Sequence, residues 1–526
     1  MALRRVDVLQ RPDLPNNEEH PLSSQAPASN YSSVQRIGLI GGALLFVALL
    51  MLPAPGDLAP ETWKTAVLAV LMGVWWLTEA LPIPVTALLP LFMIPMLGIA
   101  PMGEASAPYA SDIIYLFMGG FFLAAAMEAS GLHRRVALGI ISYFGTGSER
   151  LVFGFMLASG VLSMWINNTA TTAMMLPIAI AVTKLFNEAG PDDQTAEIGP
   201  GVGNTQLGIC LMLGIAWASS IGGVATLIGT APNLVLSAAA EELLGITIGF
   251  GEWLLVGLPV AALMLPLTWL LLVKFTNKPE AIPAGAAELL VQKREALGPR
   301  SKHETLVAVV FLFTAFAWVM RQPKALGFIT IPGLTTFFPE VRDSTIAMIS
   351  SMALFLLPLD FKRGRFCLEW RQAREIPWGV LILFGGGLSL ARAMDQTGLA
   401  AEIGSIFSGM QGASPWLIFG LIATVFVFMT EFTSNTATST MAMPILAGAA
   451  LGLGQPALVL MATAAMSASM AFMLPVGTPP NAMVFASGYV TIPIMARAGF
   501  WLNIASIAII TTAATYLVPL LLSGVS

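Results

Sequence analysis

The strongest constraint on the fold of this chain is an internal duplication. The run WINNTATTAMMLPI, from Trp165 to Ile178, is echoed by FTSNTATSTMAMPI, from Phe432 to Ile445. Asn168 and Asn435 hold the same place in the two runs and lie 267 residues apart. The same offset relates segments further upstream, LFMGGFFLA and LFGGGLSLA. The chain therefore has to fold as two related halves, each with a cluster of small polar residues between two apolar arms.

Composition indicates that both halves lie in a membrane. Of the 526 residues, 56% are hydrophobic and only 10% are charged, whereas a soluble domain has about 25% charged residues. Backbone polar groups cannot bond to lipid, so such a chain crosses the bilayer as helices, and we predict an all-α polytopic membrane protein. At ~20 residues per crossing, the apolar runs predict about 11 transmembrane helices, at 37–53, 63–81, 83–99, 112–130, 207–240, 250–273, 304–320, 341–359, 377–396, 457–490 and 497–522.

Two further apolar segments, 151–186 and 415–452, contain the duplicated runs. The first would be about 54 Å long as a single helix, against a hydrocarbon core of about 30 Å. The polar cluster splits each segment into two arms that are too short to cross comfortably. We therefore predict two re-entrant helical hairpins, whose non-helical tips are tolerated where protein or water surrounds them.

Two of the predicted spans, 207–240 and 457–490, are themselves interrupted by a second duplicated motif. It reads GTAPN from Gly229 to Asn233 and GTPPN from Gly477 to Asn481. Glycine and proline inside a spanning segment break it into two half-helices. Broken helices at corresponding positions of two halves are the best sequence indication of a transport site.

The basic residues orient the chain. Lys and Arg are concentrated in 274–302, in 362–374 and in the N-terminal tail. Counting spans from a cytoplasmic N-terminus places all of these on one side, as the positive-inside rule requires. The same count makes the halves inverted repeats, because 112–130 then runs inward and its copy 377–396 runs outward. We expect a multi-pass protein of the cell inner (plasma) membrane, with its C-terminus periplasmic or extracellular.

The two motif pairs suit the binding of small ions. Asn and Thr oxygens and freed backbone carbonyls suit a hard cation such as Na⁺, whereas the N–H groups at half-helix N-termini suit an anion. Neither motif pair contains Lys or Arg. An anion with two charges would therefore need bound cations beside it.

A purely structural interpretation competes with this one, because Ser and Thr in membrane helices often bond to their own backbone or join helices. It would be preferred for a single cluster. Two clusters in register, each paired with a helix break, favour a binding site. Glu431 has Met164 as its repeat partner. A role unique to one half is one interpretation, and a contact between helix faces is the one we prefer.

An enzyme is disfavoured by what the sequence contains. Its three histidines lie in tails or between apolar runs, and Cys210 and Cys367 have no metal or redox spacing. No phosphate-binding glycine loop and no pair of nucleophile and base is visible. We expect no catalytic residues and no nucleic-acid partner.

The chain resembles the divalent anion/sodium symporter family, which moves dicarboxylates, citrate or sulfate. The resemblance covers about 37–522 and rests on the paired hairpin runs, on the paired Gly-Thr-x-Pro-Asn loops and on WWLTEALPIPVTALLP at 75–90. It implies a homodimer in which a mobile transport domain carries substrate past a scaffold domain by an elevator movement.

The resemblance also implies site residues. One sodium site would use Ser163, Asn167, Asn168 and the backbone of Gly229, and the other would use Thr430, Ser434, Asn435 and the backbone of Gly477. Substrate carboxylates would contact Asn168, Thr169, Thr230, Asn435, Thr436, Thr478 and Pro479. Two positions depart from the family pattern, since Asn167 stands where the family usually has Ser and Ala231 replaces the first Pro of the loop.

These observations together predict sodium-coupled uptake of C4-type dicarboxylates (succinate, malate, fumarate) with at least two Na⁺ sites. A sodium-independent dicarboxylate exchanger and a citrate or sulfate symporter of the same fold are alternatives, and a channel is a weaker one. The predicted organisation is a disordered cytoplasmic tail at 1–35, scaffold helices at 37–111, a first inverted repeat at 112–275, a cytoplasmic loop at 276–303, scaffold helices at 304–359 and a second inverted repeat at 377–522.

Overall fold

The computed structural model describes residues 31–145, 147–188, 205–276, 278–280, 285–326 and 329–522. Seven of its helices are long and apolar enough to cross a membrane: Ser33–Met51, Met102–Ser130, Gln206–Val224, Phe250–Thr276, Lys302–Val319, Asn435–Leu453 and Ile492–Leu522. Shorter apolar helices lie at Ile83–Met96, Asp343–Leu356, Pro415–Met429 and Ala457–Ala468. The prediction of a helical, polytopic membrane protein is confirmed, whereas the number of crossings stays a prediction.

The first described helix is α1 (Ser33–Met51). Ser32 caps its N-terminus: the Ser32 hydroxyl accepts the backbone N–H of Gln35, and the Gln35 side chain accepts the backbone N–H of Ser32. Because the helix starts at Ser33, the predicted tail at 1–35 ends too late. Residues 1–30 lie outside the described part. Only 11% of the α1 span is buried, as expected for a helix that faces lipid.

The first repeat comprises two helices that meet at the polar cluster, a broken helix and flanking helices. Its elements are α6 (Asp112–Ser130), α7 (Leu132–Phe144), α8 (Ser148–Ser163), α9 (Asn168–Glu188), α10 (Gln206–Val224), α11 (Ala231–Leu244), α12 (Phe250–Leu270) and the π-helix η2 (Leu271–Thr276). Residues 189–204, between α9 and α10, lie outside the described part.

The second repeat follows the same order: α18 (Trp378–Gln396), α19 (Leu399–Ile406), the 3-10 turn η3 (Ser408–Met410), α20 (Pro415–Met429), α21 (Asn435–Leu453), α22 (Ala457–Ala468), α23 (Pro479–Ala486), α24 (Ile492–Thr512), the π-helix η4 (Ala513–Leu517) and α25 (Val518–Leu522). Gly131 and Gly398, which follow α6 and α18, have φ of 77° and 75°. A left-handed glycine at a helix end is a standard cap.

The remaining elements connect and flank the repeats: α2 (Pro60–Leu77), α3 (Ile83–Thr86), α4 (Leu89–Met96), α5 (Met102–Ser106), η1 (Ala107–Ala110), α13 (Ala286–Glu295), α14 (Lys302–Val319), α15 (Leu334–Phe337), α16 (Asp343–Leu356) and α17 (Trp370–Ala373). The predicted span 83–99 is therefore two short helices. Two small antiparallel pairs add β1 (Lys324–Leu326) with β2 (Ile329–Ile331), and β3 (Pro358–Asp360) with β4 (Arg365–Phe366).

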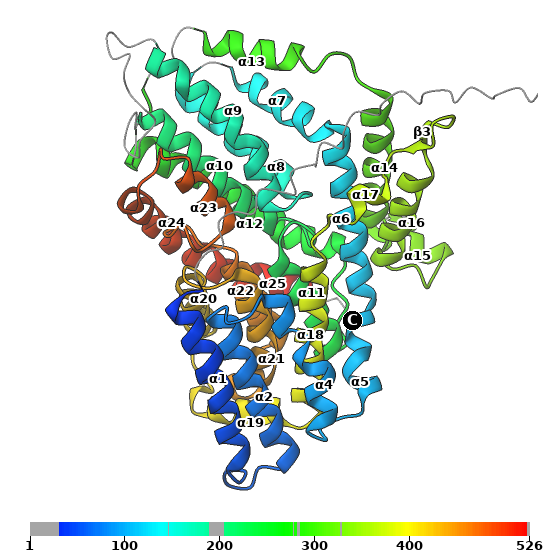
Figure 1. Cartoon of the computed structure of the whole chain (residues 1–526), viewed down its shortest axis with the longest axis vertical. Helices are drawn as coiled ribbons and strands as arrows, with labels where there is room; N and C mark the ends of the chain where they lie inside the picture. The colour runs from blue at the N-terminus through cyan, green and yellow to red at the C-terminus, as the bar shows by residue number, and fades with distance from the viewer. Residues whose placement is uncertain are drawn as a thin grey trace, which may run out of the picture.

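Helix α10 is the centre of the molecule, because every residue from Leu207 to Val224 is buried. It packs against α8, α9, α12 and α23, which surround it in the upper half of Figure 1. Its contact with α8 requires glycine, since a side-chain carbon on Gly222 would lie 2.1 Å from the carbonyl oxygen of Gly160. This close approach brings the end of α8 next to the break in the first broken helix.

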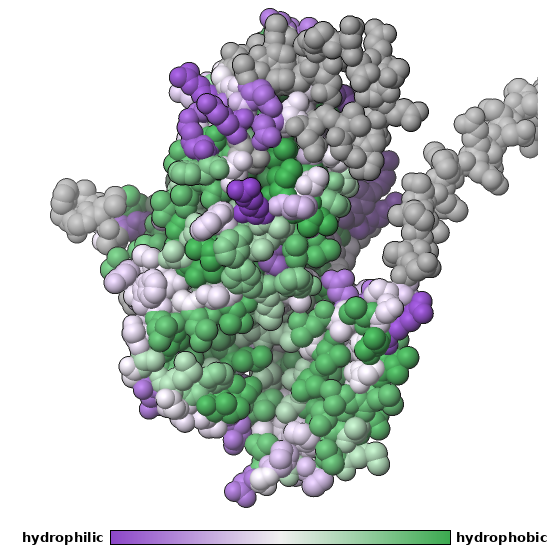
Figure 2. Space-filling view, turned by 90° about the vertical axis from the view of Figure 1, so that its left-hand side faces the viewer, coloured by the Kyte–Doolittle hydropathy of each residue, from purple (hydrophilic) through white to green (hydrophobic). Residues whose placement is uncertain are grey.

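The two repeats are interleaved. The second half of the first broken helix, α11, packs against α21 and α22 of the other repeat, and α23 packs against α9 and α10. Each broken helix therefore reaches the hairpin of the opposite half. Figure 2 shows a broad apolar surface over one face, with hydrophilic residues gathered toward its ends, as a lipid-facing protein requires.

Candidate functional site

Each hairpin tip holds a hydroxyl–amide pair in the same geometry. Helix α8 ends at Ser163 and α9 begins at Asn168, and the Ser163 hydroxyl donates to Asn168 Oδ1 at 2.6 Å. In the second repeat, Thr430 follows α20 and its hydroxyl donates to Asn435 Oδ1, also at 2.6 Å. The sequence duplication is therefore a duplication of side-chain geometry. Each of these two hydrogen bonds joins two of the predicted site residues.

The first pair adjoins the break between α10 and α11. A side-chain carbon on Gly223 would lie 2.6 Å from Asn168 Oδ1, and one on Gly229 would lie 2.9 Å from the carbonyl oxygen of Ser163. The carbonyl oxygen of Gly223 would be 2.5 Å from that same added carbon on Gly229. Glycine leaves room here for a small cradle of amide, hydroxyl and carbonyl oxygens, which is the donor set that Na⁺ prefers.

The second pair lies beside the break between α22 and α23. The Thr430 hydroxyl contacts Asn435 Oδ1 and also the carbonyl oxygen of Ala468, at 2.9 Å. Its single proton is shared between two acceptor oxygens, so this cluster has more lone pairs than protons. A side-chain carbon on Gly477 would meet Glu431 Oε2 at 3.2 Å. Both clusters therefore fit a hard cation.

Two predicted sodium ligands outside these pairs lie at the starts of helices. Asn167 Oδ1 accepts the backbone N–H of Ala170 at 2.8 Å and so caps α9, which engages one lone pair of the proposed ligand oxygen. Ser434 is the N-cap residue of α21, yet its hydroxyl makes no capping hydrogen bond. Ser434 thus keeps both lone pairs, whereas Asn167 has a structural role as well.

The predicted substrate contacts lie at four helix starts. Helices α9 and α21 begin at Asn168 and Asn435, each followed by a threonine, and their first N–H groups have no partner within the helix. Thr230 and Thr478 are the N-cap residues of α11 and α23. Helix α23 opens with Pro479 and Pro480, which lack an N–H. An anion at this end would therefore meet the Thr478 hydroxyl more than the backbone.

Asn233 and Asn481, the last residues of the duplicated loop motif, hold the helix breaks in shape. Asn233 Nδ2 donates to the carbonyls of Val224 at 3.1 Å and Thr226 at 2.8 Å. Asn481 Nδ2 donates to the carbonyls of two residues in the loop between α22 and α23, Ala471 at 3.0 Å and Leu474 at 3.1 Å. The sequence analysis included both residues in the loop motif but assigned them no role. Their presence at the same position in both halves was the indication that they have one.

Glu431 was interpreted wrongly from the sequence. It lies outside any helix and is 1% exposed, and its carboxylate accepts backbone N–H groups of the loop that follows α22, together with the Asn503 side chain. A contact between helix faces does not describe this. The repeat gave no indication, because Met164 stands at the matching position.

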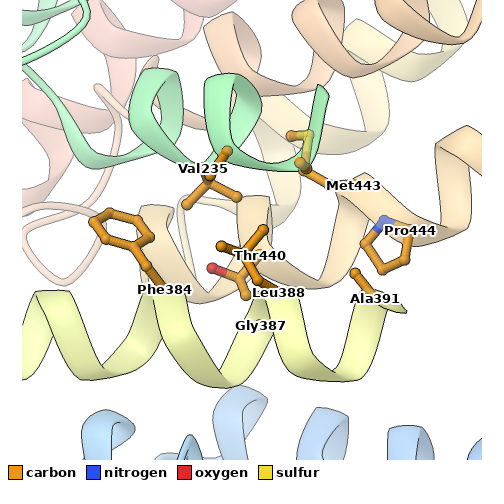
Figure 3. Close-up of a pocket in the computed structure, with 10 residues that line it drawn as sticks. Val235, Phe384, Gly387, Leu388, Ala391, Thr440, Met443 and Pro444 are labelled. Atoms are coloured by element: carbon orange, nitrogen blue, oxygen red, sulfur yellow. The ribbon is translucent and has the colours of Figure 1, made fainter. Parts of the chain in front are cut away.

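Two cavities adjoin these elements. One of about 350 Å³ lies beside the first turn of α9, where Thr171 and Ile166 line it together with Glu128, His133 and Arg134. The other, shown in Figure 3, is narrow and apolar and lies where Val235 of α11 faces α18 and α21. Both lie along surfaces where the hairpin-bearing elements meet their neighbours.

A helical membrane protein in which each half pairs a polar cluster between two helices with a broken helix has the architecture of a secondary transporter. The comparisons give the family. The pattern of the sodium:sulfate symporter transmembrane region matches residues 35–523, and the chain belongs to this family.

The chain is 41% identical over 501 residues to a sodium-dependent dicarboxylate transporter of Staphylococcus saprophyticus, covering 94% of each chain. A sodium-dependent dicarboxylate transporter of Staphylococcus aureus is also 41% identical, over 94% of this chain and 93% of its own. Among solved structures, the Alcanivorax borkumensis YdaH transporter matches with a TM-score of 0.51 at 13% identity, covering 87% of this chain and 98% of that one. This last likeness concerns the fold alone.

Proposed function

We propose that the protein takes up C4-type dicarboxylates such as succinate, malate and fumarate together with Na⁺. The observation that carries the proposal is the pair of matching clusters, Ser163 with Asn168 and Thr430 with Asn435. Each places hydroxyl and amide oxygens beside a helix break. The relatives described as sodium-dependent dicarboxylate transporters support the same assignment.

Coupling to at least two Na⁺ follows from electrostatics. Helix N-termini contribute about 1 kcal/mol each when exposed and up to about 2 when partly buried. Removing an ionised carboxylate from water costs several kcal/mol even after relaxation. The sequence motifs contain no Lys or Arg, so the N-termini alone fall short for a dianion. Sodium ions in the two cradles would supply the remaining compensation.

The two-ended arrangement favours a dicarboxylate over sulfate. Helices α9 and α21 each present an Asn-Thr start, at Asn168 and Asn435, and the proposal requires that an extended molecule with a carboxylate at each end bridges the two. A single tetrahedral ion would need both starts to close around it. If sulfate competes for uptake better than succinate does, the C4 assignment is wrong.

For the transport movement we propose an elevator mechanism in a homodimer, as the resemblance implies. The hairpins and broken helices would move as one body past α6, α16 and α18. Figure 3 shows that the contact of α18 with α11 and α21 is apolar, with Phe384, Gly387, Leu388 and Ala391 on the α18 side. Chemical cross-linking in membranes tests the dimer. If the protein is a homodimer, the cross-linked product should have twice the mass of the chain.

The experiment that tests the function is uptake of radiolabelled succinate into proteoliposomes. We expect uptake that requires an inward sodium gradient and that rises sigmoidally with sodium concentration. Undiminished net uptake with choline in place of sodium would overturn sodium coupling and favour an exchanger. A control with succinate loaded on the inside separates net uptake from exchange.

A further inference from the structure

The cavity of about 350 Å³ beside α9 is lined by two side chains of opposite charge, Glu128 near the end of α6 and Arg134 in the first turn of α7. Neither forms an ion pair with the other or with any further residue in the described part of the chain. The neighbouring Arg135, by contrast, pairs with Glu304 at 2.9 Å. Two unpaired opposite charges in one cavity leave room for a molecule that carries both charges.

Two more polar groups of the lining lack a hydrogen-bond partner. His133 Nδ1 lies 2.9 Å from the carbonyl oxygen of Met127, and because a carbonyl can only accept, Nδ1 is the donor. Burial lowers the pKa of His133, so the ring is neutral at pH 7 and its Nε2 is an acceptor that receives no proton from the described residues. The buried hydroxyl of Thr171 is also unpaired within the described part of the chain.

The rest of the lining indicates the class of ligand. It is apolar and consists of Ile166, Ala170, Ala173 and Met174. The volume lies within the range of small-molecule sites, about 300–1,000 Å³. An ammonium group has three protons to donate and matches the acceptors of Glu128 and His133, whereas a carboxylate matches the guanidinium of Arg134. A dianion is a poor match, because Glu128 repels it.

This set of side chains belongs to one half of the molecule only. At the offset of 267 residues that relates the halves, His133 and Arg134 correspond to Ala400 and Ala401. The proposed sodium clusters, in contrast, occur in both halves. A part in the duplicated transport site therefore does not account for the charged lining of this cavity.

We propose that this cavity binds a zwitterionic α-amino acid with an apolar side chain, with its ammonium group at Glu128 and its carboxylate at Arg134. The bound molecule bridges α6 and α7 to α9, the helix that begins at Asn168. It holds α9 in place and slows uptake. The inference goes beyond the proposed function, since it assigns a site of regulation rather than of transport.

The source of the amino acid follows from the surroundings of α7. Arg135 donates to the carbonyls of Leu297 and Gly298 in the segment before α14, which the basic residues place in the cytoplasm. The cavity lies at this end of α7, so the ligand is a cytoplasmic amino acid.

The first test measures binding to the purified full-length protein in detergent by titration calorimetry. The probes are L-leucine, isocaproate, which lacks the ammonium group, and isoamylamine, which lacks the carboxylate. We expect leucine to bind at least about tenfold more tightly than either analogue. Equal binding of leucine and isocaproate, or no binding of leucine, would overturn the inference. Saturating succinate and Na⁺ should leave the leucine Kd within about twofold, and competitive displacement would place leucine in the transport site and contradict the proposal.

The second test uses variants. Glu128→Gln and Arg134→Gln each remove one charge and should weaken leucine binding about tenfold or more. Arg150→Gln changes an exposed arginine of α8 outside this lining and should leave binding within about twofold. Wild-type affinity in both cavity variants would contradict the site. If a variant does not fold, the probe series on the unmodified protein decides.

The third test measures regulation in proteoliposomes with leucine on both sides of the membrane. Saturating leucine should lower the maximal rate of succinate uptake by the unmodified protein and leave that of Arg134→Gln unchanged. Undiminished uptake by the unmodified protein would overturn the restraint on α9. Absence of sodium-driven uptake without leucine would instead refute the proposed function, and the binding result would stand apart from it.

Discussion

At the scale of single residues, the site depends on two hydroxyl groups that look ordinary in the sequence. Many Ser and Thr hydroxyls in the described part of the chain bond to a carbonyl one turn earlier, as Ser159 does to the carbonyl of Phe155 at 2.8 Å. Ser163 and Thr430 instead reach the side chain of an asparagine across a hairpin tip. Both residues stand where a helix ends, and this position leaves their hydroxyl groups free to make these contacts.

Ser163→Ala and Thr430→Ala should each weaken sodium binding more than dicarboxylate binding. A hydrogen-bonding group that faces a charge contributes about 1.5–3 kcal/mol, so the sodium concentration for half-maximal uptake should rise about tenfold or more. Initial uptake rates over a sodium series measure this. Ser159→Ala, a buried hydroxyl one turn earlier in α8, is the matched control and should leave the curve in place.

At the scale of secondary-structure elements, the two broken helices differ in how far they unwind. Helix α10 continues to Val224, six residues before α11 begins at its N-cap Thr230, whereas α22 already ends at Ala468 and a longer loop leads to Thr478. The longer loop leaves more backbone N–H groups without helical partners. Glu431 accepts three of them, which explains why only the second half needs this carboxylate.

Asn233→Ala and Asn481→Ala should loosen the breaks in both halves. Each substitution leaves buried carbonyl groups without their donor, at a cost of about 1–3 kcal/mol, and lowers the midpoint of thermal unfolding in detergent. Sodium should restore less of the lost stability than in the unmodified protein, because the breaks form part of both cradles. Ser237→Ala, a buried side chain of α11 further from the break, is the control. A normal sodium response in both Asn variants would contradict this role.

At the scale of the whole molecule, Arg342 connects three helices. Its Nη1 donates to Asp112 Oδ2 of α6 at 3.0 Å and to Glu241 Oε1 of α11 at 2.6 Å. The Arg342 side chain is 53% exposed, and ion pairs this accessible contribute little, about 0–1 kcal/mol. Such a contact can break and re-form during a movement of α11 past α16.

Linking α11 to α16 should therefore stop transport if the elevator mechanism holds. Cysteines at Glu241 and Arg342, joined by a flexible bifunctional thiol reagent that reductant can remove, should abolish succinate uptake, and reductant should restore it. Each single cysteine variant treated with the same reagent is the control. Full uptake by the linked protein would show that the two helices do not separate.

Membrane orientation is tested by labelling from outside whole cells. Lys293 and Glu340 are both exposed, and the basic-residue distribution places Lys293 in the cytoplasm and Glu340 outside. Glu340→Cys should react with a membrane-impermeant maleimide and Lys293→Cys should not. Cys210 and Cys367 are buried, and burial raises the pKa of the Cys367 thiol, so the unmodified protein supplies a low background. Equal reaction at both positions would refute the orientation.

The sequence by itself determined the helical membrane architecture, the duplication, and the positions of both polar clusters and both helix breaks. These features are local, because apolar run length, Gly and Pro positions and a fixed offset need no knowledge of distant contacts. The structure decided which groups meet: the interleaving of α11 with α21, the capping role of Asn167 and the partners of Glu431. Phe472 and Asn503 are far from Glu431 in the chain, and only tertiary packing brings their donors to its carboxylate.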